Sequence, residues 1–105
     1  MRRGEVVLVD FGHPAGHEAG FVRPALVLTG ERFNRSGLFA AVPITRTRRG
    51  YPTHVEIESP LRQVSHVQCE HLRTISADRV IRSLGQAEPA VLARVEQIVS
   101  EFLEL

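Results

Sequence analysis

Two neighbouring residues of types that transfer protons lie in the segment from Gly12 to Gly20. His17 is followed directly by Glu18, within nine residues that include three glycines and one proline. That composition is typical of a loop. A histidine titrates near neutral pH, and beside a carboxylate it can act as a general acid or base. Composition alone favours the plainer interpretation, in which both side chains are simply solvated.

A second group of residues could bind phosphate. Arg23 stands directly before Pro24 at the start of a predicted strand, where it is either a surface charge or a clamp for an anion. Thr45 ends another predicted strand and is followed by Arg46, Thr47, Arg48 and Arg49. A hydroxyl followed by three arginines can neutralise several phosphates at once. A run of charge is more often a solvated loop, so this pattern is a weak indication by itself.

Polar residues also follow the predicted strand that begins at Ser65. Three of them, Gln68, Glu70 and Arg73, are candidates for a site. Strict alternation along a strand predicts that Gln68 and Glu70 share one face, while Cys69 points to the other. We interpret Cys69 as a small buried hydrophobic residue.

The histidines and the cysteine have spacings that resemble fragments of metal sites. His66, Cys69 and His71 lie close together in the chain, as do His13 and His17. In an alternating strand, however, His66 and Cys69 face opposite sides, and the other pair lies in a loop rather than on one face of a helix. The sequence also lacks a glycine motif that cradles phosphates and a nucleophile elbow. We therefore expect no metal site and no cofactor.

The length of 105 residues, at 11.7 kDa, predicts a single domain, 1–105, and excludes a two-domain enzyme with a separate cofactor fold. Hydrophobic residues make up 43% of the chain and charged residues 24%, so the chain can bury a core. No apolar run approaches the roughly 18 residues of a membrane span, and no signal peptide precedes the first predicted strand. A single cysteine fits a reducing compartment. We expect a small cytoplasmic protein without a membrane segment.

The positive charge of the chain is carried by arginine alone. All 13 basic side chains are arginines, and the net charge is +1. Basic residues are in excess in the first half and acidic residues in the second half. Arginine presents a planar fork that grips phosphate and stacks on bases, which favours a nucleic-acid partner. A compositional bias of the source genome explains the same pattern equally well.

Short β-rich segments separated by turn residues predict a small β-barrel. The expected strands are 5–11, 24–29, 38–45, 53–58, 65–72 and a short segment around residue 84. Pro43, inside the third of these, indicates an edge strand or a bulge. A short helix capped by Ser76 is expected over 77–82.

The hydrophobic pattern changes to a helical period after Pro89. Apolar residues then fall on one helical face, at Val91, Leu92, Val95, Ile98, Val99, Phe102 and Leu103. An acid and a proline at 88–89 form a suitable first turn. We expect this helix to cover one end of the barrel, and any excess apolar surface to form a dimer contact.

Several short segments are spread over nearly the whole chain. Each is a weak signal alone, but their order and spacing together are specific. They are 3–6, 8–10, 15–18, 20, 23–27, 33–34, 42–45, 50–52, 54–56, 65 with 67, 69–70, 72–75 and the helix start from Pro89. Together they resemble the MazF/PemK/Kid toxins of type II toxin–antitoxin modules. The resemblance implies an SH3-like β-barrel (PemK/CcdB-like) that works as a homodimer. It also implies silencing by a cognate, MazE-like antitoxin with an acidic, disordered C-terminal segment.

The resemblance further implies a ribosome-independent, sequence-specific endoribonuclease that inhibits translation and growth. Its members cut single-stranded RNA (mRNA, tRNA or rRNA) without metal, by attack of the ribose 2′-OH on the adjacent phosphate. The products are a 2′,3′-cyclic phosphate and a 5′-OH. Carried over by position, the catalytic residues are Arg23, Thr45, Glu18, His17 and Glu70. The RNA-binding residues are then Arg46, Thr47, Arg48, Arg49, Gln68 and Arg73.

Four positions depart from the family pattern. Gln68 stands where the PemK/Kid branch has arginine, so phosphate stabilisation must depend on Arg23 or the 46–49 loop. Glu70 replaces the usual aspartate, and the remaining departures are His71 and Phe21. Metal-free cleavage needs a base for the 2′-OH, positive charge at the phosphorane and an acid for the 5′-oxygen.

Arginine stays protonated, so Arg23 is expected to stabilise charge rather than to act as a base. His17, Glu18 and Glu70 are the nearby proton carriers, and which of them is acid or base stays open.

Two other functions remain as alternatives. One is a CcdB-like poison of DNA gyrase, which has the same barrel and acts through C-terminal residues that include a terminal Trp-Gly-Ile. This chain has no tryptophan and ends at Phe102-Leu-Glu-Leu105. The other alternative is an SH3-like RNA-binding module without catalysis, and the joint presence of Arg23, Thr45, Glu18 and His17 argues against it.

Overall fold

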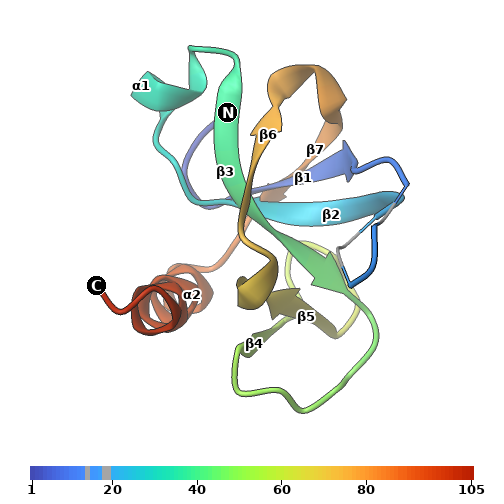
Figure 1. Cartoon of the computed structure of the whole chain (residues 1–105), viewed down its shortest axis with the longest axis vertical. Coiled ribbons are helices and arrows are strands. Elements are labelled where there is room, and N and C mark those ends of the chain that lie inside the picture. Colours follow the sequence, from blue (N-terminus) through green and yellow to red (C-terminus); the bar gives the residue numbers. More distant parts are fainter. Residues whose placement is uncertain (14, 18–19) are drawn as a thin grey trace.

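The computed structural model describes residues 1–13, 15–17 and 20–105. Its elements in chain order are β1 (Glu5–Asp10), β2 (Val22–Val27), α1 (Glu31–Asn34), β3 (Leu38–Thr45), β4 (His54–Ile57), β5 (Ser65–Gln68), η1 (Cys69–His71), β6 (Arg73–Ser76), η2 (Ala77–Arg79), β7 (Val80–Gln86) and α2 (Pro89–Phe102). The prediction of a mainly β chain with a C-terminal helix is confirmed (Figure 1). No helix in the described part is long and apolar enough to cross a membrane.

Strand β3 is the centre of the sheet and changes partner along its length. The strands are hydrogen-bonded in the order β4-β5-β3-β2-β1-β7, and β6 pairs with β3 outside this path. All of the pairs are antiparallel. One edge of β3 pairs with β2, while the other edge pairs with β6 over 38–41 and with β5 at 44–45. The sheet therefore bends around β3, which belongs to both halves (Figure 1).

The interpretation of Pro43 as a mark of an edge strand is wrong. β3 is an interior strand, and Pro43 stands opposite Ala25 of β2. The carbonyl of Ala40 accepts a hydrogen bond from Leu28 on the β2 side, so by alternation Pro43 directs its backbone to the other edge. Neither β6 nor β5 pairs with residues 42–43 there. The proline is tolerated because its missing N–H falls at this change of partner.

Both faces of the β1–β2–β3 sheet are buried. One face packs with β4, β5 and α2, and its core includes Val6, Leu26, Val42, Val67, Val95 and Ile98. The other face packs with β6, and its core includes Val7, Val9, Ala25, Phe39 and Ile75. Helix α2 therefore packs against one of the two cores and covers it, in agreement with the prediction of a covering helix (Figure 1). Towards its C-terminus Phe102 and Leu103 stay 50% and 47% exposed.

Several predicted elements differ from the structure. The strands expected over 5–11, 24–29 and 53–58 are β1, β2 and β4 with shifted ends, while α1 and β6 were not predicted. The helix expected over 77–82 is only the 3-10 turn η2, because Val80 already pairs with Val9 of β1 as the first residue of β7. Ser76 does cap that turn, since its hydroxyl accepts a hydrogen bond from the Asp78 N–H. The strand expected over 65–72 ends at Gln68, where the chain enters the 3-10 turn η1.

The close approach of β7 to the loop after β4 gives a test of the fold. Gly85 has φ +129°, and a Cβ there would lie 2.9 Å from Cβ of Pro60. We expect Gly85→Ala to lower the free energy of unfolding by about 2–3 kcal/mol, from backbone strain together with this overlap. Urea unfolding measures the change. Gly30→Ala is the matched control, because Gly30 has φ −78° and nothing lies within 4 Å of the added methyl. Equal losses in the two variants would contradict the argument.

Candidate active site

Arg23 lies between two cavities and lines both of them. It is the second residue of β2, and its side chain is partly buried. The cavity on the side of Thr45, called here the Thr45 cavity, has a volume of about 740 Å³. The cavity on the side of Glu70, called the Glu70 cavity, has a volume of about 480 Å³. Among the described residues Arg23 alone lines both cavities, so its guanidinium can reach a ligand that spans them.

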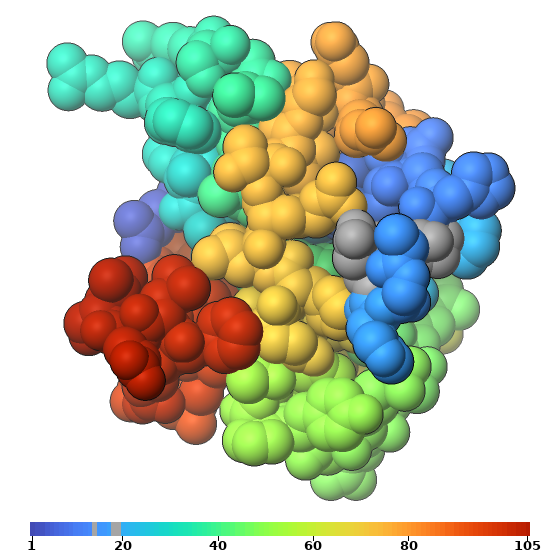
Figure 2. All heavy atoms as spheres, viewed as in Figure 1, coloured from blue at the N-terminus to red at the C-terminus, as the bar shows by residue number. Residues whose placement is uncertain are grey.

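Three segments that are distant in the sequence meet at the Glu70 cavity. They are the β1–β2 loop, the β3–β4 loop and the end of β5, and besides Arg23 they supply Gly16, His17, Arg49, Tyr51, Gln68, Glu70 and His71. In the space-filling view the β1–β2 loop (blue) lies against the segment around residues 65–75 (yellow), above the β3–β4 loop (green) (Figure 2). The structure thus brings together five of the predicted site residues: His17, Arg23, Arg49, Gln68 and Glu70.

The carboxylate of Glu70 is held by two adjacent side chains, Thr53 directly before β4 and His54 at its start. The hydroxyl of Thr53 donates a hydrogen bond of 2.9 Å to Oε1, and Nε2 of His54 lies 2.8 Å from Oε2. A carboxylate only accepts, so Nε2 carries the proton of this bond. The side chain of Glu70 is 23% exposed, whereas that of His54 is 4% exposed. Nε2 of His71 is 3.9 Å from the same Oε2, beyond hydrogen-bond distance.

These contacts lower the pKa of Glu70. Burial is the largest single influence and would raise the pKa of the carboxyl group. Hydrogen bonds from its own backbone N–H, from His54 and from Thr53 oppose burial, and the net effect is a lowered pKa. The pKa of Glu70 therefore lies below the ordinary value of 4.5, and the group is ionised at neutral pH.

Gln68 stands beside Arg23 in the same cavity. Its side chain is 5% exposed, and its Oε1 accepts a long hydrogen bond of 3.5 Å from Nη1 of Arg23. Gln68 and Glu70 line one cavity while Cys69 is fully buried, as predicted. The physical reason differs from strand alternation, because the 3-10 turn η1 redirects the chain after Gln68.

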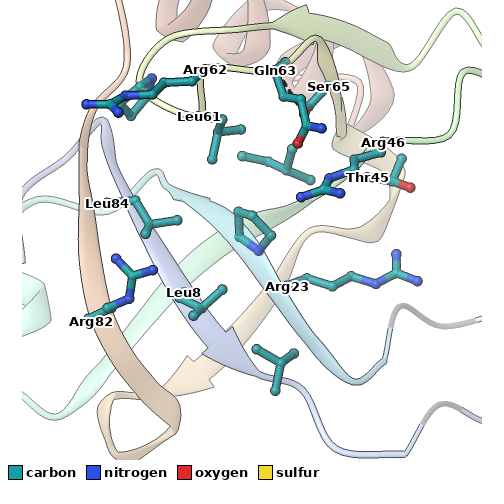
Figure 3. A pocket seen from close by; sticks show the side chains of 14 residues that line it. Leu8, Arg23, Thr45, Arg46, Leu61, Arg62, Gln63, Ser65, Arg82 and Leu84 are labelled. Carbon is teal, nitrogen blue, oxygen red and sulfur yellow. Dashed lines mark hydrogen bonds between the residues drawn. The ribbon is translucent and has the colours of Figure 1, made fainter.

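The Thr45 cavity has an apolar floor and an arginine rim. Apolar side chains of the floor come from β1, β3, β7 and the loop after β4, and they include Leu8, Ile44, Leu61 and Leu84. Of the residues that the structure describes, four arginines and no acidic residue lie on the rim: Arg23, Arg46, Arg62 and Arg82. In Figure 3 Arg23, Arg46 and Thr45 lie on one side and Arg62 and Arg82 on the other, with Leu8 between them. The hydroxyl of Thr45 accepts a hydrogen bond of 3.2 Å from the Thr47 N–H.

Three predicted site residues that the structure describes, Thr47, Arg48 and Arg73, line neither cavity. Thr47 and Arg48 are exposed in the loop after β3 but line neither cavity. Arg73 lies on β6 opposite Ala41, and its guanidinium carbon is 5.5 Å from the centre of the Phe11 ring. Glu18 lies outside the described residues.

Sequence reasoning missed residues that the structure places at the site. His54 looked like an ordinary polar position of an alternating strand, although it is the partner of Glu70. Tyr51 is half exposed, and its ring packs edge-on against His54 with 5.1 Å between the ring centres. Arg62 and Arg82 are distant from the arginine run in the sequence, and only the fold brings them to the Thr45 cavity.

Cys69 is the small buried residue that the sequence predicted. Burial, and to a smaller extent the charge of Glu70, raises the pKa of its thiol to about 12. Both nucleophilic attack and metal ligation use the thiolate, which is not populated at neutral pH. Within residues 1–13, 15–17 and 20–105, no group of three or more His, Cys, Asp or Glu side chains is placed to hold a metal ion.

Comparison with known sequences identifies the class of protein. Residues 2–103 match the family described as "PemK-like, MazF-like toxin of type II toxin-antitoxin system", and the chain belongs to this family. It is 31% identical over 115 residues to Endoribonuclease MazF9 of Mycobacterium tuberculosis, covering 100% of this chain and 98% of that protein. It is 29% identical over 111 residues to Endoribonuclease EndoA of Bacillus subtilis, covering 100% and 96%.

Solved structures agree with this assignment. MazF from Deinococcus radiodurans superposes with a TM-score of 0.91 at 33% identity, covering 100% of this chain and 97% of that chain. A MazE–MazF structure from the same organism gives a TM-score of 0.85 at 33% identity, with 100% and 96% covered. The family resemblance and the small β-barrel predicted from the sequence are confirmed.

The contacts of Arg23 predict that it contributes little to stability. Its hydrogen bond to Gln68 is long, and among the described residues it forms no ion pair. We expect Arg23→Ala to change the free energy of unfolding by less than about 0.5 kcal/mol. Arg73→Ala, which removes the contact with Phe11, is expected to cost about 0.5–1 kcal/mol. Urea unfolding at neutral pH measures both changes. A loss above about 2 kcal/mol in Arg23→Ala would show that this arginine serves the fold.

Proposed function

We propose that this toxin is a sequence-specific, metal-independent endoribonuclease that cuts single-stranded RNA in the cytoplasm. The class of enzyme follows from the family and from its curated relatives, which are endoribonucleases. The observation that supports the site most directly is the position of Arg23 between the two cavities. An arginine at that point can bind a phosphate while the nucleotides on either side enter the two cavities.

The chemistry of the site fits cleavage by the 2′-OH of the substrate. The ribose 2′-oxygen attacks the adjacent phosphorus, a proton carrier takes its proton, and a new 2′-O–P bond forms. The P–O5′ bond breaks, and the 5′-oxygen takes a proton from a second carrier. His17 and Glu70 line the cavity as carriers, and Arg23 stabilises the charge of the phosphorane. Thr45 and Arg46 hold the strand on the other side of Arg23.

An antitoxin partner follows from the family and from its structural relatives. The MazF of Deinococcus radiodurans has been solved together with MazE. We place an acidic, disordered segment of a MazE-like antitoxin over the exposed loop 46–49, where it competes with the phosphates of RNA. A homodimer is part of the same proposal, and the half-exposed Phe102 and Leu103 provide apolar surface for it.

Removing Arg23 is expected to abolish cleavage without unfolding the protein. We expect Arg23→Ala to cut a long single-stranded RNA at least about 100-fold more slowly, because the phosphorane loses its main positive partner. The assay contains EDTA and maps the ends of the products. The expected products carry a 2′,3′-cyclic phosphate and a 5′-OH.

The matched control for that assay is Arg35→Ala, which removes an exposed arginine at the end of α1, outside both cavities. Its rate is expected to equal that of the wild type. Equal rates for Arg23→Ala and Arg35→Ala would contradict the proposed site. RNA that is bound but never cut would instead support a binding module without catalysis.

The placement of the antitoxin predicts a salt-dependent complex. We expect the triple change Arg46→Ala, Arg48→Ala and Arg49→Ala to weaken binding of a short acidic protein encoded beside this gene by about tenfold or more. The loss should shrink as salt is added, because screening already weakens these contacts in the wild type. Calorimetry at low and at moderate salt measures both effects. Affinity that depends neither on salt nor on these arginines would exclude the placement.

A further inference from the structure

The fold places two hydrogen-bond donors, Thr53 and His54, next to the carboxylate of Glu70. His54 begins β4 and stands opposite Gln68, the last residue of β5. The carbonyl of Thr53 accepts a hydrogen bond of 3.1 Å from the Cys69 N–H, which ties the two strand ends together. The 3-10 turn η1 then carries Glu70 back over Thr53 and His54. This arrangement depends on main-chain pairing, so the three side chains meet without a flexible loop.

The hydrogen bonds around Glu70 indicate which ring nitrogen of His54 carries the proton. With its proton on Nε2, His54 donates to Glu70, and the carboxylate accepts from both neighbours. Nδ1 of His54 is buried and has no hydrogen-bond partner among the described residues. A proton on Nδ1 would therefore be a buried donor without an acceptor, which is costly. The edge-on ring of Tyr51 keeps His54 in place from the cavity side.

We propose that His54 and Thr53 are positioning residues that fix Glu70 as a permanent hydrogen-bond acceptor facing the bound RNA. Each carboxylate oxygen has a second lone pair besides the one that Thr53 or His54 uses. Glu70 lines the cavity and is partly exposed, so these lone pairs are available to substrate. Held in this way, Glu70 accepts a hydrogen bond or a proton from RNA and does not donate one.

The role of Glu70 in a reaction rests on the proposed function. If the site cleaves RNA, Glu70 cannot supply the proton that the 5′-oxygen takes. Two histidines, His17 and His71, are among the described residues that line the Glu70 cavity, and the proposed function assigns the role of donor to His17. The pair His17 and Glu70 thereby divides into a donor and an acceptor.

The sign of the expected titration follows from the contacts. Burial raises the pKa of Glu70, and the hydrogen bonds of His54 and Thr53 oppose that effect. Removing either donor leaves burial less opposed, so the pKa of Glu70 rises. The other titratable or charged groups around it are those of His17, Arg23, Arg49, Tyr51, Cys69 and His71.

The test is a titration of the Glu70 carboxyl carbon by 13C NMR in the intact protein. In the wild type the midpoint is expected below the ordinary value of 4.5. In His54→Ala it is expected to rise by about one pH unit or more, a tenfold change in the ionisation constant. Thr53→Val should raise it by a smaller amount, and Thr53→Ser should restore the wild-type midpoint. Thr53→Val keeps the shape of the side chain, so it provides the same test if His54→Ala does not fold.

Two controls make the titration specific. His71→Ala removes a histidine 3.9 Å from the same oxygen and is expected to move the midpoint far less than His54→Ala. Thr74→Val repeats the loss of a hydroxyl at an exposed position of β6 and should leave the midpoint unchanged. A midpoint that is the same in wild type, His54→Ala and Thr53→Val would overturn the proposal.

The cleavage assay separates this inference from the proposed function. The acidic limb of the kcat/KM profile should move upward in His54→Ala by the same amount as the NMR midpoint and should not move in Thr53→Ser. A shifted midpoint with an unshifted acidic limb would exclude a role of this contact in the reaction. If no RNA is cut by the wild type, the proposed function is contradicted, while the NMR titration still decides whether His54 and Thr53 hold Glu70 ionised.

Discussion

The change of partner along β3 is the constraint on which the rest of the cleft depends. Up to Ala41 the strand pairs with β6, and from Ile44 it pairs with β5. Pro43 falls in the gap, where a residue without an N–H is tolerated. The switch places the end of β3, which carries Thr45, beside β5, and Thr45 lines one cavity together with Arg23 of β2. A β3 paired with β6 throughout would leave β5 without a place in the sheet.

The end of β5 shows how the cleft keeps an ionised carboxylate partly buried. Burial disfavours the charge of Glu70, and a carboxylate without partners would take up a proton instead. The donors that oppose this effect, Thr53 and His54, are held by the antiparallel β4–β5 pair. Because the main chain fixes the β4–β5 pair, the ionised state of Glu70 depends on this pairing.

Much of the architecture could be predicted from residue patterns. β3 has the bounds that were predicted, and α2 begins at Pro89 as its helical period indicated. The residues that line the Glu70 cavity were named in part, because His17, Arg23, Arg49, Gln68 and Glu70 have types suited to chemistry. His54 could not be found, because its importance comes from the register of β4 against β5. Arg73 has the same residue type as Arg23, and only its place over Phe11 separates the two.

The two cavities place unequal charge on either side of Arg23. Among the described residues, four arginines and no acid line the Thr45 cavity, whereas an ionised Glu70 lines the other cavity together with Arg23 and Arg49. A polyanion is attracted most strongly along the arginine rim, and a carboxylate repels phosphate while it attracts hydrogen-bond donors. In the proposed reaction the phosphates of an RNA strand therefore bind preferentially at the Thr45 cavity. On the other side it presents hydroxyl or base donors to Glu70, and this asymmetry orients the strand over Arg23.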